Sequence, residues 1–140
     1  MVQTKMMKDC IFCKIIQGEI PCEKIYEDSQ ALAFLDIHPI NKGHVIVVPK
    51  EHTENLLTVS TTLLHKVMDA VQKIAIALSK KTDGINIGIN NKPAAGQIVF
   101  HWHVHVIPRF TNDLLKHWPG KTYQEGEAQK IAQDLKKLIG

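Results

Sequence analysis

Short segments in which apolar residues alternate with polar ones, or form unbroken runs, predict a small antiparallel sheet. Two of them meet at Asp28-Ser29, a turn that predicts a hairpin. The run His44–Val48 is almost wholly apolar and is stopped by Pro49, as expected for a central strand covered on both faces. The predicted strands are Lys24–Glu27, Ala31–Leu35, His44–Val48, the alternating run Ile85–Ile89 with one buried face, and Phe100–Arg109.

Apolar residues at helical spacing predict one long helix and two shorter ones. The long helix runs from about Ser60, a suitable N-cap, to Lys80. One or two helical turns are expected over Cys10–Gly18, and a final amphipathic helix over Ala128–Ile139 with Ile131, Leu135 and Leu138 facing inward. Strands joined by short turns together with one long helix predict an α+β fold.

Length and charge narrow the class of protein. A chain of 140 residues is most simply one domain, with a tail over residues 1–9, a folded domain over 10–110 and a C-terminal extension with a helix over 111–140. The net charge of +3 comes without a dense basic run, so no duplex nucleic acid partner is expected, and no apolar stretch approaches the length of a membrane span. Three cysteines, an odd number, argue against a disulfide framework and favour the reducing cytoplasm.

The run Phe100–Arg109 carries three histidines at alternate positions, and it is the strongest chemical signal in the chain. In a strand, His101, His103 and His105 would lie on one face over roughly 13 Å, at about 3.3 Å per residue. Trp102, Val104 and Val106 would point the other way, into a core. A patch of three imidazoles that are neither hydrogen-bonded nor ligated would be costly to bury, so a functional site is favoured.

Two kinds of chemistry fit this pattern. In the first, His103 attacks a phosphorus atom as a neutral imidazole whose other nitrogen is held as N–H, while a neighbouring cationic imidazole protonates the leaving group. In the second, all three histidines bind one catalytic metal, a known zinc arrangement. Alternate strand positions diverge too far to converge easily on one ion, so the nucleophile fits better.

The sequence His101-Trp102-His103-Val104-His105-Val106-Ile107 resembles the His-φ-His-φ-His-φ-φ signature, with φ apolar, of the histidine triad family of nucleotide-binding proteins. Gly96-Gln97 and three upstream segments (Ile11–Ile16, Asp36-Ile37 and His44–Lys50) resemble other common segments of that family, and the resemblance covers about residues 9–110. It implies a five-stranded antiparallel sheet with a long helix, in a two-fold homodimer. It also implies hydrolysis or transfer at the α-phosphorus of a purine nucleotide derivative, such as a nucleoside phosphoramidate or a dinucleoside polyphosphate.

The resemblance also implies roles for individual residues. His103 would be the nucleophile, His105 the contact to the α-phosphate and leaving group, and His101 and His44 supporting histidines. Asp36 would accept both ribose hydroxyls, which suits a carboxylate because it only accepts hydrogen bonds. Asn90, Gly96 and Gln97 would lie on the phosphate side, with Ile98 where the best-known eukaryotic branch has a serine. The base would lie between Phe12, Ile15, Phe34, Ile37 and Ile46, although core packing explains these five equally well.

The pair Cys10-x-x-Cys13 is a weak signal alone, because small thiols near a core are more often just packing. Some bacterial-type members that the chain resembles combine such a pair with a histidine at the position of His52 and with the first triad histidine. Cys10, Cys13, His52 and His101 would then form a closed, structural zinc site, and no catalytic metal would be required. A nucleotide-binding regulatory or adaptor protein with little turnover is the main alternative function, and a structural zinc protein without a nucleotide role is a weaker one.

Overall fold

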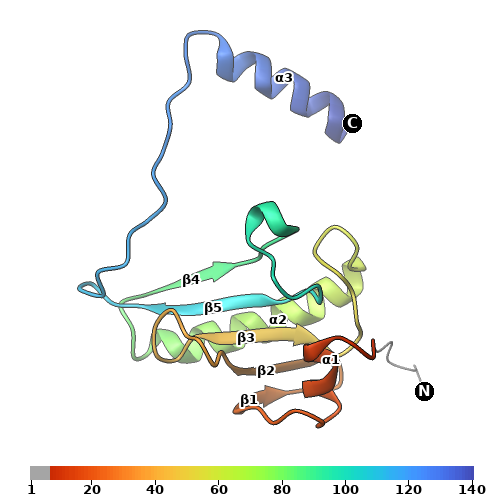
Figure 1. Ribbon diagram of the computed structural model, residues 1–140. Helices are drawn as coiled ribbons and strands as arrows, with labels where there is room; N and C mark the ends of the chain where they lie inside the picture. The colour runs from red at the N-terminus through yellow and green to blue at the C-terminus, as the bar shows by residue number, and fades with distance from the viewer. Residues whose placement is uncertain (1–6) are drawn as a thin grey trace.

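The structure, a computed structural model, describes residues 7–140 and contains a five-stranded antiparallel sheet in the order β1-β2-β3-β5-β4 (Figure 1). This confirms the predicted α+β fold. The first six residues of the predicted tail lie outside the described part of the chain. The elements are α1 (Ile11–Ile16), β1 (Lys24–Glu27), β2 (Ala31–Leu35), β3 (Val45–Pro49), α2 (Thr61–Ser79), β4 (Gly84–Gly88), the 3-10 turn η1 (Pro93–Ala95), β5 (Val104–Arg109) and α3 (Glu127–Ile139).

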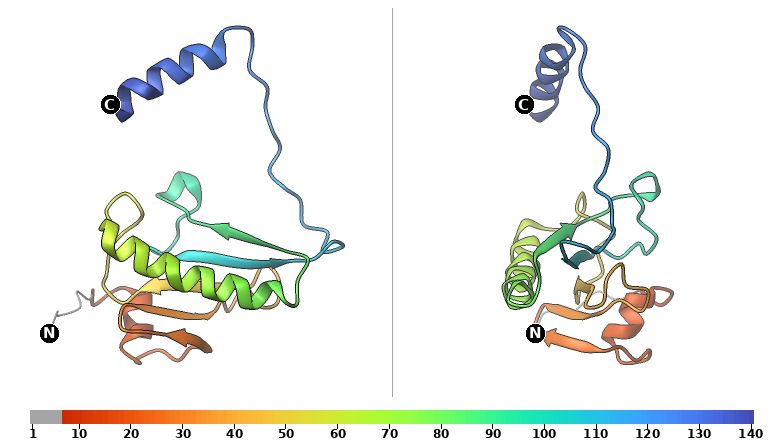
Figure 2. Two further views of the ribbon diagram at one scale, coloured as in Figure 1. Left: turned by 180° about the vertical axis from the view of Figure 1, so that it is seen from behind. Right: turned by 90° about the vertical axis from the view of Figure 1, so that its left-hand side faces the viewer.

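Helix α2 covers one face of the sheet, as Figure 2 shows from behind. Ser60 caps it, since its hydroxyl accepts a hydrogen bond from the Leu63 N–H at 3.2 Å. The apolar side of α2 packs against β3 and β5, and burial of each large apolar side chain contributes about 1.5–3 kcal/mol. Trp102 and Val104 lie in this core, as predicted, together with Ala31, Ala33, Val45, Val47, Leu63, Val67, Ala70, Val71, Ile74 and Val106.

The short helix α1 covers part of the opposite face of the sheet. Phe12 from α1 packs edge-on against Phe34 of β2, with ring centroids 5.7 Å apart. Leu32, Ile46 and Val48 complete this second core. Strand β3 is therefore covered on both sides, which explains its unbroken apolar sequence.

Strand β5 is shorter than the sequence predicted. It begins at Val104, so His101 and His103 precede it and only His105 of the three histidines lies in the strand. The backbone of Trp102 is taken out of the ladder, because its N–H donates to the carbonyl oxygen of Thr53 at 2.6 Å. The histidines are therefore not three equivalent positions on one strand face.

Strand β4 forms one edge of the sheet, and its predicted buried face is incomplete. Ile85 and Ile89 pack against the α2 core, but Ile87 is 44% exposed. An edge strand has no neighbour to cover its outer side, and this leaves the middle isoleucine open.

The C-terminal helix forms as predicted, but its apolar side does not face the domain. Ile131, Leu135 and Leu138 are all exposed, and no residue of α3 is buried. The chain leaves β5, makes a turn held by the Arg109–Asp113 ion pair at 2.8 Å, and then extends away from the sheet (Figures 1 and 2).

Within residues 7–140, no helix is long and apolar enough to cross a lipid bilayer.

Candidate functional site

His103 is held with one ring nitrogen free. Its Nδ1 lies 2.7 Å from the carbonyl oxygen of His101, which can only accept a hydrogen bond. Nδ1 therefore carries the proton and Nε2 carries a lone pair. The ring of Phe12 stands edge-on to that of His103 at 5.1 Å between centroids, which limits the orientations the imidazole can take.

His105 is held in the opposite tautomer through His44. The Ile40 N–H donates to His44 Nδ1 at 3.1 Å, so the proton of this buried imidazole is on Nε2. His44 Nε2 lies 2.9 Å from His105 Nδ1 and donates to it. The proton of His105 is consequently on Nε2. The rings of His103 and His105 are 4.9 Å apart, so a nitrogen lone pair and an N–H donor are offered side by side.

Burial keeps these imidazoles neutral. It lowers the pKa of His103 and His44 below the usual value, and that of His105 to about 4. The neighbouring His103 and His44 lower the pKa of His105 further. The sequence predicted a cationic imidazole beside the nucleophile, whereas the structure places a neutral hydrogen-bond donor there at pH 7.

Asp36 follows β2 and lies beside the same pair of histidines. Its Oδ2 is 3.7 Å from His44 Nε2, and its Oδ1 accepts the His38 N–H at 2.8 Å. Ligand atoms of Asp36, His44 and His105 lie within 4.8 Å of one another, a spacing compatible with a metal. The proton on His44 Nε2 argues against a metal ion at this position. For Nε2 to bind a metal, its proton would have to move to Nδ1, and the hydrogen bond from the Ile40 N–H would be lost.

The five predicted wall residues divide into two groups. Phe12, Phe34 and Ile46 are buried in the second core, with Ile15 packed at its edge. Ile37, in contrast, is 84% exposed, so core packing does not explain it. Ile98 is also open, at 86% exposed.

The loop before the histidines is held by the side chain of Gln97. Its Oε1 accepts the Lys92 N–H at 2.7 Å, and its Nε2 donates to the carbonyl oxygens of Glu54 and Val99 at 2.7 and 3.1 Å. Both Nε2 hydrogens are thereby used within the protein. Gly96 has φ of +94°, and a Cβ there would meet the Asn90 amide at 3.5 Å. Gln97 thus shapes the loop that carries Gly96 and Ile98.

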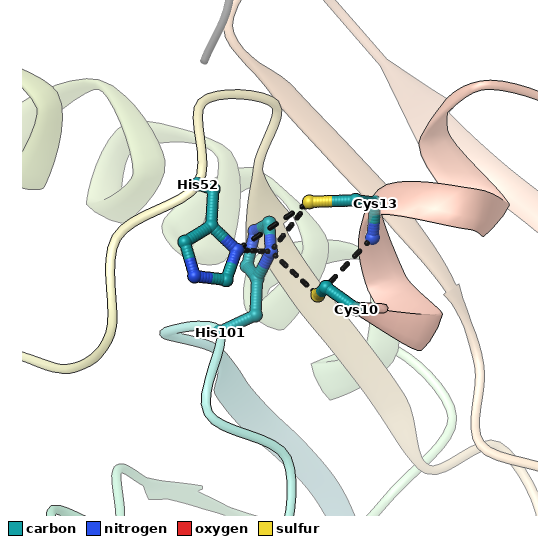
Figure 3. A group of neighbouring side chains, drawn as sticks. All are labelled: Cys10, Cys13, His52 and His101. Atoms are coloured by element: carbon teal, nitrogen blue, oxygen red, sulfur yellow. Dashed lines mark hydrogen bonds between the residues drawn. The ribbon is translucent and has the colours of Figure 1, made fainter. Parts of the chain in front are cut away.

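Cys10, Cys13, His52 and His101 form a second cluster (Figure 3). The Sγ atoms of Cys10 and Cys13 lie 3.3 and 3.5 Å from His101 Nδ1. His52 Nδ1 lies 3.4 Å from Cys13 Sγ and 3.2 Å from His101 Nδ1. Ligand atoms of a tetrahedral zinc site lie about 3.3–3.8 Å apart, given Zn–N of about 2.0 Å and Zn–S of about 2.3 Å. The four residues therefore fit a zinc ion.

The surroundings of this cluster also suit a metal. His101 Nε2 donates to the Pro49 carbonyl oxygen at 2.8 Å, which leaves the lone pair on Nδ1, facing the thiols. Backbone N–H groups of Met7 and Cys13 donate to the two sulfurs, at 3.3 and 3.4 Å. Burial raises the pKa of Cys13 to about 11, so a bound cation is needed to keep this thiol ionised at neutral pH. Cys22, the third cysteine, is a half-buried free thiol that lies outside this cluster.

Several groups that organise the site have no sequence signal. The Pro49 and His101 carbonyls and the Ile40 N–H each select a histidine tautomer, and they are main-chain groups. Glu54 contributes its carbonyl oxygen, not its carboxylate. Only the folded backbone reveals these partners.

A sequence profile of the HIT domain matches residues 17–112, about two thirds of the chain. The chain belongs to the HIT family. Its relatives include the adenosine 5'-monophosphoramidase of Schizosaccharomyces pombe, 36% identical over 93% of this chain and 98% of the relative. An adenylylsulfatase of Arabidopsis thaliana is 37% identical over 96% of this chain and 68% of the relative.

Crystal structures of other HIT proteins share the fold. A protein from Streptococcus mutans superposes with a TM-score of 0.90 at 42% identity, covering 99% of this chain and 92% of the other. A Zn-bound histidine triad protein from Mycobacterium smegmatis superposes with a TM-score of 0.74 at 36% identity, covering 94% and 96%.

Proposed function

We propose that this HIT protein is a nucleotide-binding hydrolase or transferase that acts at the α-phosphorus of a nucleotide derivative. The observation that carries the proposal is the pairing of opposite tautomers: a neutral His103 with a free Nε2 beside a neutral His105 with a proton on Nε2. The names of the phosphoramidase and adenylylsulfatase relatives support the same class of reaction. Nucleoside phosphoramidates and dinucleoside polyphosphates are the proposed substrates.

In the first step, His103 Nε2 attacks the α-phosphorus and the bond from phosphorus to the leaving group breaks. The electron pair of that bond goes to the leaving atom, to which His105 Nε2–H donates a hydrogen bond. A sulfate or phosphate chain departs as an anion, whereas an amine takes a proton from solvent. The nucleotidyl-imidazolium keeps its Nδ1–H on the His101 carbonyl oxygen, which stabilises its positive charge.

In the second step, water attacks the phosphorus and the bond to His103 Nε2 breaks. The nucleoside monophosphate keeps the water oxygen, a proton passes to solvent, and His103 regains its lone pair. Two easier displacements thus replace one difficult one. Asp36, at the end of β2, is the proposed acceptor for the ribose hydroxyls, and exposed Ile37 a proposed wall for the base.

The test compares His103→Ala with His65→Ala, a control histidine exposed on α2. Turnover of a fluorogenic adenosine phosphoramidate should fall at least about a thousandfold in His103→Ala, because the nucleophile is lost. Nucleotide binding, measured by calorimetry, should persist. Rapid quenching of the wild type should trap one nucleotidyl group on His103, detected by mass spectrometry. Wild-type turnover in His103→Ala would refute the mechanism, and binding without turnover in the wild type would favour the regulatory alternative.

We also propose that the cluster of Cys10, Cys13, His52 and His101 holds a structural zinc ion. A bound zinc would cross-link α1, the loop after β3 and the segment before β5, and it has no role in the two displacements. One zinc per chain is expected by elemental analysis of protein made without chelators, falling to near zero in a Cys10→Ser/Cys13→Ser variant. A homodimer and a cytoplasmic location remain predictions from the resemblance and the cysteine content.

A further inference from the structure

Lys92, in the loop that joins β4 to β5 through η1 (Figure 1), has a main-chain conformation that favours glycine. Its φ of +73° and ψ of 161° lie in a region that residues with a Cβ rarely enter. The Lys92 N–H donates to Gln97 Oε1 at 2.7 Å, and its carbonyl oxygen accepts the N–H groups of Ala95 and Gln97, both at 3.1 Å. These three hydrogen bonds impose the conformation on whichever residue stands at this position.

The side chain of Lys92 does not offset the cost of this conformation through contacts within the chain. Lys92 is exposed, and its ammonium group makes no hydrogen bond or ion pair within residues 7–140. Arg109, by contrast, is ion-paired with Asp113 at 2.8 Å. Glycine would adopt the same φ without strain. A lysine at this position is therefore unfavourable for the fold alone, and its ammonium group is available to a ligand.

The course of β4 brings Lys92 close to the candidate site. Gly88, the last residue of β4, lies opposite His105 in the sheet. Ile89 packs into the α2 core, so its neighbour Asn90 lies towards the opposite face, which carries His105. The side-chain amide of Asn90 makes no hydrogen bond in the described part of the chain and is also open to a ligand. Lys92 is two residues beyond Asn90 and carries its charge on a flexible four-carbon stem.

The candidate site lacks positive charge for the reaction proposed above. Burial keeps His44 and His105 neutral at pH 7, and Asp36 adds a carboxylate beside them. Displacement at the α-phosphorus adds a negative charge to an oxygen leaving group such as a phosphate chain or sulfate. Asp36 follows β2 and Lys92 follows β4, and the strand order places these two strands on opposite sides of β5. With the nucleoside at Asp36, the leaving group extends towards the loop that carries Lys92.

We propose that Lys92 determines leaving-group specificity: its ammonium group binds an anionic oxygen leaving group and raises the rate for nucleotidyl anhydrides relative to phosphoramidates. This inference rests on the proposed function. When the bond from the α-phosphorus to the leaving oxygen breaks, the electron pair stays on that oxygen. No proton is required, because the Lys92 ammonium group stabilises the new charge. With an amine, the electron pair goes to nitrogen, which takes a proton from solvent and leaves as a neutral molecule, so Lys92 has no anion to stabilise.

The first test compares Lys92→Gln with the matched control Lys42→Gln, which removes an exposed charge from the loop after β2. The measured quantity is the ratio of kcat/KM for an anhydride, either adenylyl sulfate or diadenosine tetraphosphate, to kcat/KM for a fluorogenic adenosine phosphoramidate. This ratio should fall about 3- to 10-fold in Lys92→Gln, stay within about twofold in Lys42→Gln, and be retained in Lys92→Arg. A fall with only one anhydride would assign Lys92 to that leaving group.

The second test uses Lys92→Gly, which removes the charge and the backbone strain together. The ratio should fall as far as in Lys92→Gln, while the melting temperature should rise by roughly 2–4 °C. An unchanged ratio in Lys92→Gln or Lys92→Gly, an equal fall in Lys42→Gln, or a lower melting temperature in Lys92→Gly would overturn this inference and leave the proposed function standing. A wild-type protein that turns over neither class of substrate would refute the proposed function, and this inference with it.

Discussion

His44 offers the sharpest test of tautomer control, because its two ring nitrogens have separable tasks. Nδ1 accepts the Ile40 N–H at 3.1 Å, and Nε2 donates to His105 at 2.9 Å. His44→Gln can retain a donor near Nε2 but loses the acceptor for Ile40. His44→Met fills a similar volume and loses both.

The two variants should share one effect and differ in the other. The hydrogen bond from the Ile40 N–H to His44 is partly buried and is worth about 0.5–1.5 kcal/mol, so both variants should lose that much unfolding free energy in urea. A net hydrogen bond is worth about 0.5–1.5 kcal/mol, so releasing His105 to its other tautomer should lower kcat roughly 2- to 13-fold in His44→Met alone. KM should change little, since His44 is buried.

Stopped-flow and steady-state turnover of an adenosine phosphoramidate, with circular dichroism in urea, measure both quantities on the same samples. Equal kcat values in wild type and His44→Met would refute tautomer control. A fall in His44→Gln as large as that in His44→Met would show that the Ile40 contact, not the donor to His105, matters for rate.

Three further predictions concern pH, metal and nucleotide binding. The pKa of His105 is about 4 in the folded chain and about 6.5 in the unfolded chain, so the unfolded chain binds more protons between pH 4 and pH 6.5. The contribution of His105 to the free energy of unfolding is therefore full above pH 6.5 and is lost as the pH falls towards 4. Unfolding free energy should thus drop by about 2 kcal/mol more between pH 7.0 and 5.0 in wild type than in His105→Gln, and equal slopes in urea titrations would contradict this. Removing metal with a chelator should lower the melting temperature by at least about 10 °C, with recovery on adding zinc, and an unchanged melting curve in metal-free protein would argue against a structural site. Asp36→Asn should raise KM for the nucleotide substrate about tenfold by weakening two acceptor contacts, with a smaller change in kcat; a change confined to kcat would exclude the ribose contact.

The layered part of the fold could be predicted because each pattern has one physical cause. The unbroken apolar run of β3 reflects cover on two faces, and the helical spacing of α2 reflects cover on one. The turn at Asp28 was predicted for a similar reason, since its carboxylate accepts the Gln30 and Ala31 N–H groups at 2.8 Å.

Two errors arose where the same pattern has two causes. The alternation of residues around the three histidines indicates a strand. The Trp102 N–H, however, donates its hydrogen bond to the Thr53 carbonyl oxygen and not to a neighbouring strand, and β5 begins only at Val104. The spacing of Ile131, Leu135 and Leu138 indicates a covered face without saying which molecule covers it. Periodicity therefore predicted the helix α3 but not the exposure of its apolar side in one chain.

The sequence predicted which histidines gather at the candidate site and a neutral His103 with one ring nitrogen held as N–H, but it predicted a cationic neighbour where His105 is neutral. The motif named His103 and His105, and the pairing of Cys10 and Cys13 with two histidines was predicted by resemblance. The tautomers depend on the carbonyl of His101 and the N–H of Ile40, which are main-chain groups that do not depend on the identity of the side chain except at proline. Burial lowers the pKa of His105 for a reason that likewise needs the folded chain.

The side chain and the main chain of His101 have separate roles. Its imidazole faces the thiols, while its carbonyl oxygen fixes the proton of His103. Any amino acid has a carbonyl, so replacing the side chain at this position need not disturb the nucleophile as long as the main chain keeps its course. The proposed metal binding and the proposed phosphoryl chemistry are therefore separable in this chain, and a protein designer could exchange the cysteine and histidine cluster for a tightly packed apolar one while leaving His103 and His105 as they are.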